Sequence, residues 1–331
     1  MLRALLAAAM TVGAAPIYAG EIGASGLDLE LKGGVSAAVF RARHPAALDQ
    51  NHVQLTDFMV ELVSAEPQAR ELGVTVGVGV LSSTTVLGER IGAAAGNAAG
   101  LQFGWVTFKP TDALSLEVGK LATNIGYEVR PTYDNTSITL SGMWTAQPNF
   151  YPGARANYTR KENTFYAEVG NYARREATHS LGLGLRGATG DVEYGANFFG
   201  APGDRRLYDF VVTMPIGNVV AGVNVDYLRL ENPTVLQDNH ALGIGLHVLA
   251  HVGDIDVPLR IESLRDGTSG IYGVDHGWTA TVTPTLNMGQ AGFVRAELAY
   301  VHAGEDRRNP LTGARDSLTN LIAAVQMGTQ F

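Results

Sequence analysis

The chain contains no cysteine, few charges and, beyond its first residues, no long apolar run. Without cysteine, disulfides and thiol chemistry are excluded. Asp, Glu, Lys and Arg make up 17% of the residues, whereas roughly 25% is usual for a soluble domain. The formal net charge is −8 and there is no basic stripe, which argues against nucleic acid as a partner. No segment provides the ~20 consecutive apolar residues that a membrane-spanning helix needs.

The start of the chain has the composition of a secretory signal. Arg3 gives a short basic start, residues 4–16 are small and apolar, and Ala19 is the small residue that a signal peptidase needs. We expect residues 1–19 to be a signal peptide cleaved after Ala19, and residues 20–331 to form a single domain. Loss of Arg3 takes the formal charge from −8 to −9. A buried helix is the alternative interpretation.

Apolar residues alternate with polar or small residues in many short segments, the pattern of strands with one apolar face. Leu72 and Val74, for example, alternate with Gly73 and Thr75. The pattern predicts about sixteen strands, with twelve, fourteen or eighteen as alternatives. The expected strands are residues 25–41, 53–65, 72–81, 101–109, 114–120, 153–159, 164–172, 178–187, 191–200, 206–215, 219–230, 240–252, 256–263, 274–286, 291–303 and 317–331.

The connectors between these strands alternate between short and long. Short ones such as 188–190 and 216–218 carry Gly and Asn, whereas residues 82–100, 121–152 and 304–316 form long ones. Bacterial barrels have short turns at one side of the membrane and long loops at the other. Without spanning helices, only a closed barrel satisfies every backbone group in lipid. The sequence therefore predicts an all-β fold, a transmembrane antiparallel up-and-down β-barrel.

The end of the chain supports the same fold. Leu321, Val325 and Phe331 share one strand face, and Gln326 and Gln330 share the other. A last strand that closes on a terminal Phe resembles the outer-membrane barrel proteins of Gram-negative bacteria. That resemblance implies that Phe331 is an assembly signal for the barrel-assembly machinery. It also implies export through the periplasm to the outer membrane, with membrane lipid and lipopolysaccharide as partners.

The long connector at 121–152 is the third on its side of the predicted barrel. Together with the end of the preceding strand it carries Gly119-Lys120, then Thr123, then Ile125-Gly126-Tyr127-Glu128, and later Tyr151-Pro152-Gly153. These motifs resemble the putative β-barrel porin-2, OmpL-like family. The resemblance implies passive diffusion of small hydrophilic solutes and ions. In general porins the third loop folds into the barrel and narrows it, and such porins are usually homotrimers, so we expect both features here.

Strand parity predicts which charged residues face the lumen. Eleven acidic candidates against five basic ones predict a negative lumen and a mild cation preference. Cross-strand salt bridges are the alternative, and would leave selectivity to the loop. The acidic candidates are Asp28, Glu30, Asp57, Glu61, Glu117, Glu168, Glu193, Asp209, Asp226, Glu262 and Glu297, and the basic ones are Lys32, Arg155, Arg186, Arg260 and Arg295.

The pore constriction is expected where the third loop meets the wall. Arg155 and Arg186 are expected to face Glu117 and Glu128 across the narrowing and to set up a transverse field. The candidates for the constriction are Glu117, Lys120, Tyr127, Glu128, Arg130, Tyr133, Asp134, Trp144, Arg155 and Arg186.

Other functions find less support in the sequence. A substrate-specific channel would use the aromatic residues of the third loop as a binding slide for sugars or aromatic solutes. A lipid hydrolase would need a serine and histidine pair, for which His276 with Ser269 or His302 with Ser317 are the candidates. A structural barrel with a plugged lumen is the remaining alternative. No cofactor or metal is expected: the G-x-G-x-x-G match at 182–187 lies inside a strand, with no helix after it.

Overall fold

The structure, a computed structural model, describes residues 20–24, 27–43, 50–82, 85–87, 99–172, 178–233, 239–267, 269, 271–304 and 319–331. The expected signal peptide and parts of several long connectors lie outside these ranges. The described residues contain no helix that is long and apolar enough to cross a membrane.

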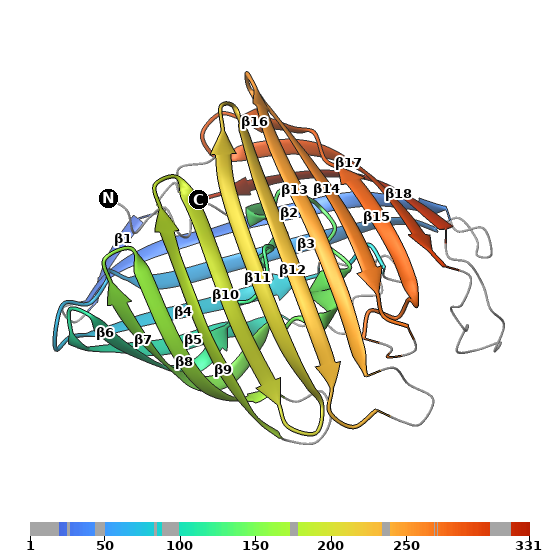
Figure 1. Ribbon diagram of the computed structural model, residues 1–331. Coiled ribbons are helices and arrows are strands. Elements are labelled where there is room, and N and C mark those ends of the chain that lie inside the picture. Colours follow the sequence, from blue (N-terminus) through green and yellow to red (C-terminus); the bar gives the residue numbers. More distant parts are fainter. Residues whose placement is uncertain are drawn as a thin grey trace.

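The described chain is a single antiparallel sheet that closes on itself (Figure 1). Neighbouring strands along the chain pair with each other, and β18 pairs with β2 to close the barrel, with Val325 opposite Val39. The strands are β1 (Gly20–Ala24), β2 (Leu27–Arg43), β3 (Gln50–Ser64), β4 (Leu72–Leu81), β5 (Gly100–Thr111), β6 (Leu114–Ala122), β7 (Phe150–Arg160), β8 (Asn163–Tyr172), β9 (Thr178–Thr189), β10 (Val192–Ala201), β11 (Arg205–Ile216), β12 (Val219–Leu230), β13 (His240–Val252), β14 (Ile255–Arg265), β15 (His276–Val282), β16 (Thr285–Met288), β17 (Gly292–Ala303) and β18 (Thr319–Gln330).

In the described ranges, β2 to β18 build a wall of sixteen strands. β15 and β16 both pair with β14 and with β17, so they are two parts of one wall strand, interrupted before Thr285. Pro284 lies in the interruption, and proline has no N–H to donate to the ladder. β1 is an addition to the wall, because among the described residues it pairs with β2 alone, where Gly20 lies opposite Leu31. The predicted barrel of sixteen strands is confirmed, whereas β1 and the interruption were not predicted.

The two ends of the barrel differ as the connectors predict. At one end, two-residue turns join β9 to β10, β11 to β12 and β13 to β14, with positive φ at Gly190, Gly217 and Gly253. A residue with positive φ allows the tight hairpin turns that match strand twist. At the other end lie the long connectors, of which residues 123–149 form the third. We call these two ends the short-turn end and the long-loop end.

The outer surface of the barrel is apolar, whereas much of the inner surface is buried. On β18, Val325 and Met327 face outward and are 54% and 63% exposed, whereas Ile322 and Gln326 face inward and are fully buried. The inward residues are covered by residues 123–149, which we call the inner loop. It contains two 3-10 turns, η2 (Thr132–Asp134) and η3 (Met143–Ala146), and Figure 1 shows it in green between the walls.

Candidate functional site: the inner loop and the lumen

The inner loop leaves the wall after β6 and returns to it at β7. Its two ends meet where the Thr123 N–H donates to the Asn149 carbonyl at 2.9 Å. Between these residues the chain crosses the lumen with few regular hydrogen bonds of its own. Because buried backbone groups must find partners, the barrel wall has to supply them.

Carboxylates of the wall accept hydrogen bonds from the inner loop. Glu297 on β17 accepts the N–H groups of Ile138 at 2.6 Å and Thr139 at 3.2 Å, and the Thr139 hydroxyl at 2.6 Å. Glu262 on β14 accepts the N–H groups of Gly142 at 3.2 Å and Met143 at 3.1 Å. Two strands on the same side of the barrel thus anchor the middle of the inner loop.

Arginines of the wall donate to carbonyls of the same loop. Arg295 on β17 donates to Thr132 at 2.7 Å and Asn135 at 2.6 Å. Arg205 on β11 donates to the Ala146 carbonyl at 3.0 Å. Sequence reasoning missed Arg205, because the predicted strand began one residue later, at 206. Arg205 lies two positions before the inward residue Leu207, so the alternation along the strand predicts that Arg205 also faces inward.

Two further wall residues extend the anchoring around the barrel. Asp57 on β3 accepts the Thr132 N–H at 2.9 Å, and Asp226 on β12 accepts the Gln147 amide at 2.8 Å. Together with β11, β14 and β17, the wall contacts the loop from several directions. Many of the predicted lumen charges therefore bind the inner loop instead of lining a water-filled channel.

The predicted transverse field is not the arrangement that the structure shows. Glu117 and Arg155 lie opposite each other on the adjacent strands β6 and β7, with 3.3 Å between Glu117 Oε2 and Arg155 Nη1. Arg155 also binds Glu168 on β8, at 2.7 Å. Glu128 faces neither Arg155 nor Arg186: it forms a buried ion pair with Arg260 on β14. The predicted position of Glu128 was wrong because the alternation along strands gives no information on the position of a residue in a loop.

Arg186 and Lys120 lie at the edge of the inner loop. Arg186 donates to Asn124 at 2.9 Å, near the ion pairs that Arg155 forms with Glu117 and Glu168. Lys120 donates to the Leu101 carbonyl at 3.0 Å, and its ammonium lies 5.9 Å from the centre of the Phe150 ring.

The aromatic residues of the loop pack into the interior and do not form an exposed binding slide. Tyr127 stacks on His247 with 3.8 Å between ring centres, and Arg130 lies 5.8 Å from the ring of Trp144. Trp144 is 4% exposed, Tyr133 is 7% exposed and Tyr127 is 9% exposed. Rings this deeply buried are not available to stack on a passing sugar.

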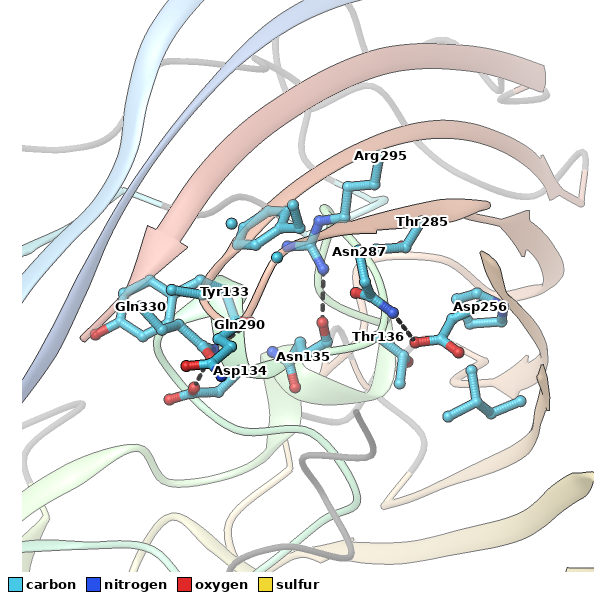
Figure 2. Close-up of a pocket in the computed structure, with 16 residues that line it drawn as sticks. Tyr133, Asp134, Asn135, Thr136, Asp256, Thr285, Asn287, Gln290, Arg295 and Gln330 are labelled. Carbon is cyan, nitrogen blue, oxygen red and sulfur yellow. Dashed lines mark hydrogen bonds between the residues drawn. The ribbon is translucent and has the colours of Figure 1, made fainter. Parts of the chain in front are cut away.

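A cavity opens at the short-turn end, between the tip of the inner loop and strands β13, β14, β16, β17 and β18 (Figure 2). Its empty volume is about 710 Å³, which includes its mouth. Gln330 donates to Asp134 at 2.9 Å and Asn287 donates to Asp256 at 2.9 Å across its lining. Burial, and to a smaller extent nearby Glu61 and Asp57, raise the pKa of the Asp134 carboxyl to about 8, although Arg295 lowers it.

The candidate catalytic residues have other contacts where the structure describes them. Ser269 donates to Asp266, Ser317 lies outside the described ranges, and His302 packs 6.2 Å from the Trp278 ring. Among the described residues, no three His, Asp or Glu side chains gather in a way that would hold a metal ion.

The fold is shared with solved outer-membrane proteins. OmpF from Salmonella typhi in complex with daunomycin aligns with a TM-score of 0.67 at 12% identity, over 94% of this chain and all of that one. OmpT of Vibrio cholerae gives 0.63 at 13% identity, over 95% and 100%. An anion-selective porin from Comamonas acidovorans gives 0.63 at 11% identity, over 92% and 100%.

Sequence comparison identifies the family. No curated protein matches the chain in sequence. The family described as putative beta-barrel porin-2, OmpL-like matches residues 63–331, most of the chain. This match extends far beyond the motifs around the third connector. The closed barrel, the inner loop and the family match agree, and the chain belongs to the beta-barrel porin-2, OmpL-like family of outer-membrane porins.

Proposed function

We propose that this porin lets small hydrophilic solutes and ions diffuse passively across the outer membrane. The observation that carries the proposal is the asymmetric filling of the lumen. Inward residues of β6, β9, β10 and β11 toward the short-turn end stay partly exposed, whereas those of β14 and β17 are buried under the inner loop. The partly exposed set consists of Ser115, Glu117, Arg186, Glu193 and Thr213. A polar wall of this kind suits a water-filled path.

The constriction of this path lies beside the start of the inner loop. Glu117, Arg155 and Arg186 come together there with Asn124, and they are the predicted constriction residues that we retain. Glu117 is the most accessible charge of the Arg155 ion pairs, with a side-chain exposure of 17% against 3% for Glu168. Lys120 lies on β6, the strand of Glu117, and closer to the long-loop end. The other candidates, on the inner loop, act by holding the loop in place.

A mild cation preference is part of the proposal. Acidic residues outnumber basic ones on the inward faces, and partly exposed Glu61 and Glu193 lie outside the ion pairs described above. One structural neighbour is named as an anion-selective porin, so the shared fold does not determine the sign of the selectivity. The sign has to come from the side chains of the path.

The test is the reversal potential of the refolded porin in a planar bilayer with a salt gradient. We expect a cation-biased reversal potential in the wild type, a shift toward anions in Glu117→Gln and a shift toward cations in Arg186→Gln. Glu71→Gln, an exposed position in the turn before β4, is the control and should change nothing. If neither Glu117→Gln nor Arg186→Gln changes the reversal potential, ions cross the barrel by another route.

The remaining expectations complete the proposal. Cleavage after Ala19 would make Gly20, the first residue of β1, the mature N-terminus. Phe331 would serve as the assembly signal, and lipid and lipopolysaccharide would cover the apolar belt. A homotrimer is proposed by analogy, since one structural neighbour, OmpT of Vibrio cholerae, is described in a trimer form, with a TM-score of 0.57 at 12% identity over 92% of this chain and 99% of that one.

A further inference from the structure

The long-loop end of the lumen is filled by apolar side chains from three connectors. They belong to residues 85–87, to the inner loop and to residues 271–274, and each is at most 8% exposed. We call this set the outer seal. Its members are Val86, Leu87, Ile125, Ile138, Met143, Ala146, Ile271, Tyr272 and Val274.

The three connectors contact one another inside the barrel. Thr85 pairs with Leu140 of the inner loop in an isolated bridge, and the Val86 N–H donates to the Leu140 carbonyl at 2.9 Å. A Cβ atom placed on Gly142 would lie 2.8 Å from a methyl of Leu87, which shows how closely that side chain covers the glycine.

The third connector closes over the same place. A Cβ atom placed on Gly243 of β13 would lie 2.6 Å from the Tyr272 hydroxyl and 2.9 Å from Met143 Cγ. Asp266 fixes the fold of this connector, because its carboxylate accepts the N–H groups of Tyr272 at 2.6 Å and Gly273 at 3.0 Å. Side chains from two connectors therefore meet over one glycine of the wall.

The wall completes the apolar layer. On β12, β14 and β18 the inward residue near the long-loop end is apolar, namely Leu228, Leu264 and Ile322, each at most 1% exposed. The further inward residues of the layer are Ala38, Phe40, Phe199, Ala201, Leu207, Ala241, Ala299, Val301, Ala303 and Ala324. They come from strands β2, β10, β11, β13, β17 and β18, so the layer reaches across the barrel and not only along one side.

We propose that the outer seal is a gate, which closes the long-loop end of the barrel and has to be displaced before solute passes. This inference rests on the proposed function as a diffusion channel. Apolar constrictions block ions because water leaves them. Among the described residues, the outer seal comes from three separate connectors and packs against inward residues of at least eight wall strands. Its movement would open the lumen without breaking the hydrogen bonds between those strands.

The first test compares Met143→Asn with Met143→Leu in planar bilayers. We expect a mostly closed wild-type channel with brief openings. An amide buried without partners destabilises the closed state, so Met143→Asn should raise the open fraction about tenfold or more. Met143→Leu keeps an apolar side chain of similar volume and should behave like the wild type. Heat-modifiable migration in gels verifies that each barrel is folded.

The second test locks the seal. The chain has no cysteine, so Thr85→Cys combined with Leu140→Cys, at two bridge partners, introduces a single possible disulfide between the connector of residues 85–87 and the inner loop. The oxidised protein should stay closed, and a reducing agent should restore openings. Gel mobility with and without the reductant verifies the bond.

The outcomes separate the two proposals. Large, steady conductance in the wild type that neither Met143→Asn nor the disulfide changes would overturn the gate and leave the diffusion channel standing. Folded barrels that conduct in no variant, Met143→Asn included, would overturn both.

Discussion

The inward residues near the long-loop end and those further inside the barrel differ in chemistry although the same strands carry both. On β14, Leu264 near the long-loop end is apolar, whereas Glu262 and Arg260, two and four residues further in, are charged, and all three are at most 2% exposed. On β18, Ile322 and Gln326 show the same change. The apolar end packs like the core of a soluble protein. The charged residues further in, which include Arg260, Glu262 and Glu297 and which we call the charged band, bind the backbone of the inner loop. Inward orientation and burial therefore do not imply one chemical role.

The largest expected effect comes from removing the central cation of the charged band. Arg260 is 2% exposed and binds Glu128 and Glu262. Arg260→Met leaves both buried carboxylates without their cation, which should lower the free energy of unfolding by about 3–5 kcal/mol. Urea unfolding in detergent micelles measures it. The control is Arg206→Met, whose pair with Glu231 is half exposed and should contribute under ~1 kcal/mol. Equal losses would show that the band is not a buried network.

A pH dependence tests the apolar end. Burial raises the pKa of the Asp266 carboxyl from 3.8 to about 6, against the N–H groups of Ile271, Tyr272 and Gly273, which lower it. The pKa of Asp266 is higher in the folded chain than in the unfolded chain. The contribution of Asp266 to the free energy of unfolding is therefore complete below pH 3.8 and is lost as the pH rises through about 6.

The difference between the wild type and Asp266→Asn isolates this group. Between pH 4 and 7 the wild type should lose on the order of 3 kcal/mol relative to the variant. Urea midpoints across that pH range measure the difference. Parallel curves for the two proteins would mean that Asp266 does not titrate in this range.

A smaller effect is expected for a single anchor of the inner loop. Glu297 accepts hydrogen bonds from Ile138, Thr139 and Thr283. Glu297→Gln replaces one acceptor oxygen by a donor group, which should cost about 1.5–3 kcal/mol and expose the loop to protease. Glu193→Gln, on the partly exposed side, is the matched control. Resistance to proteolysis that equals the wild type would remove Glu297 from the anchors.

Most of the wall follows from local pattern. The bounds of β4, β12 and β13 agree with the predicted ranges, because alternating side chains and turn residues are encoded within each hairpin. β1 escaped notice because five residues are too few to show a period, and the break before β16 depends on one proline, Pro284, within an otherwise regular alternation. The pairing of Glu117 with Arg155 does not follow in this way, because the inner loop, and not a tight turn, joins β6 to β7.

The partners of the inner loop do not follow from local pattern. Glu128 and Arg260 are separated by 132 positions, and Glu297 and Ile138 by 159. Such contacts depend on where an irregular segment comes to rest, and parity carries no information on that. The sequence shows that Glu297 points inward, but not that it meets two amides instead of water.

The end of the chain has a consequence for how barrels behave toward one another. The N–H and carbonyl of Phe331 both bond to Gly33 at 2.9 Å, so β18 covers the edge of β2 only as far as that glycine. Beyond it, β1 pairs with Leu27–Leu31 of β2. Without β1 this stretch would be an open strand edge, and open edges recruit strands from other chains. The five residues of β1 thus act as a cover against self-association at the place where the first and last strands of the wall join.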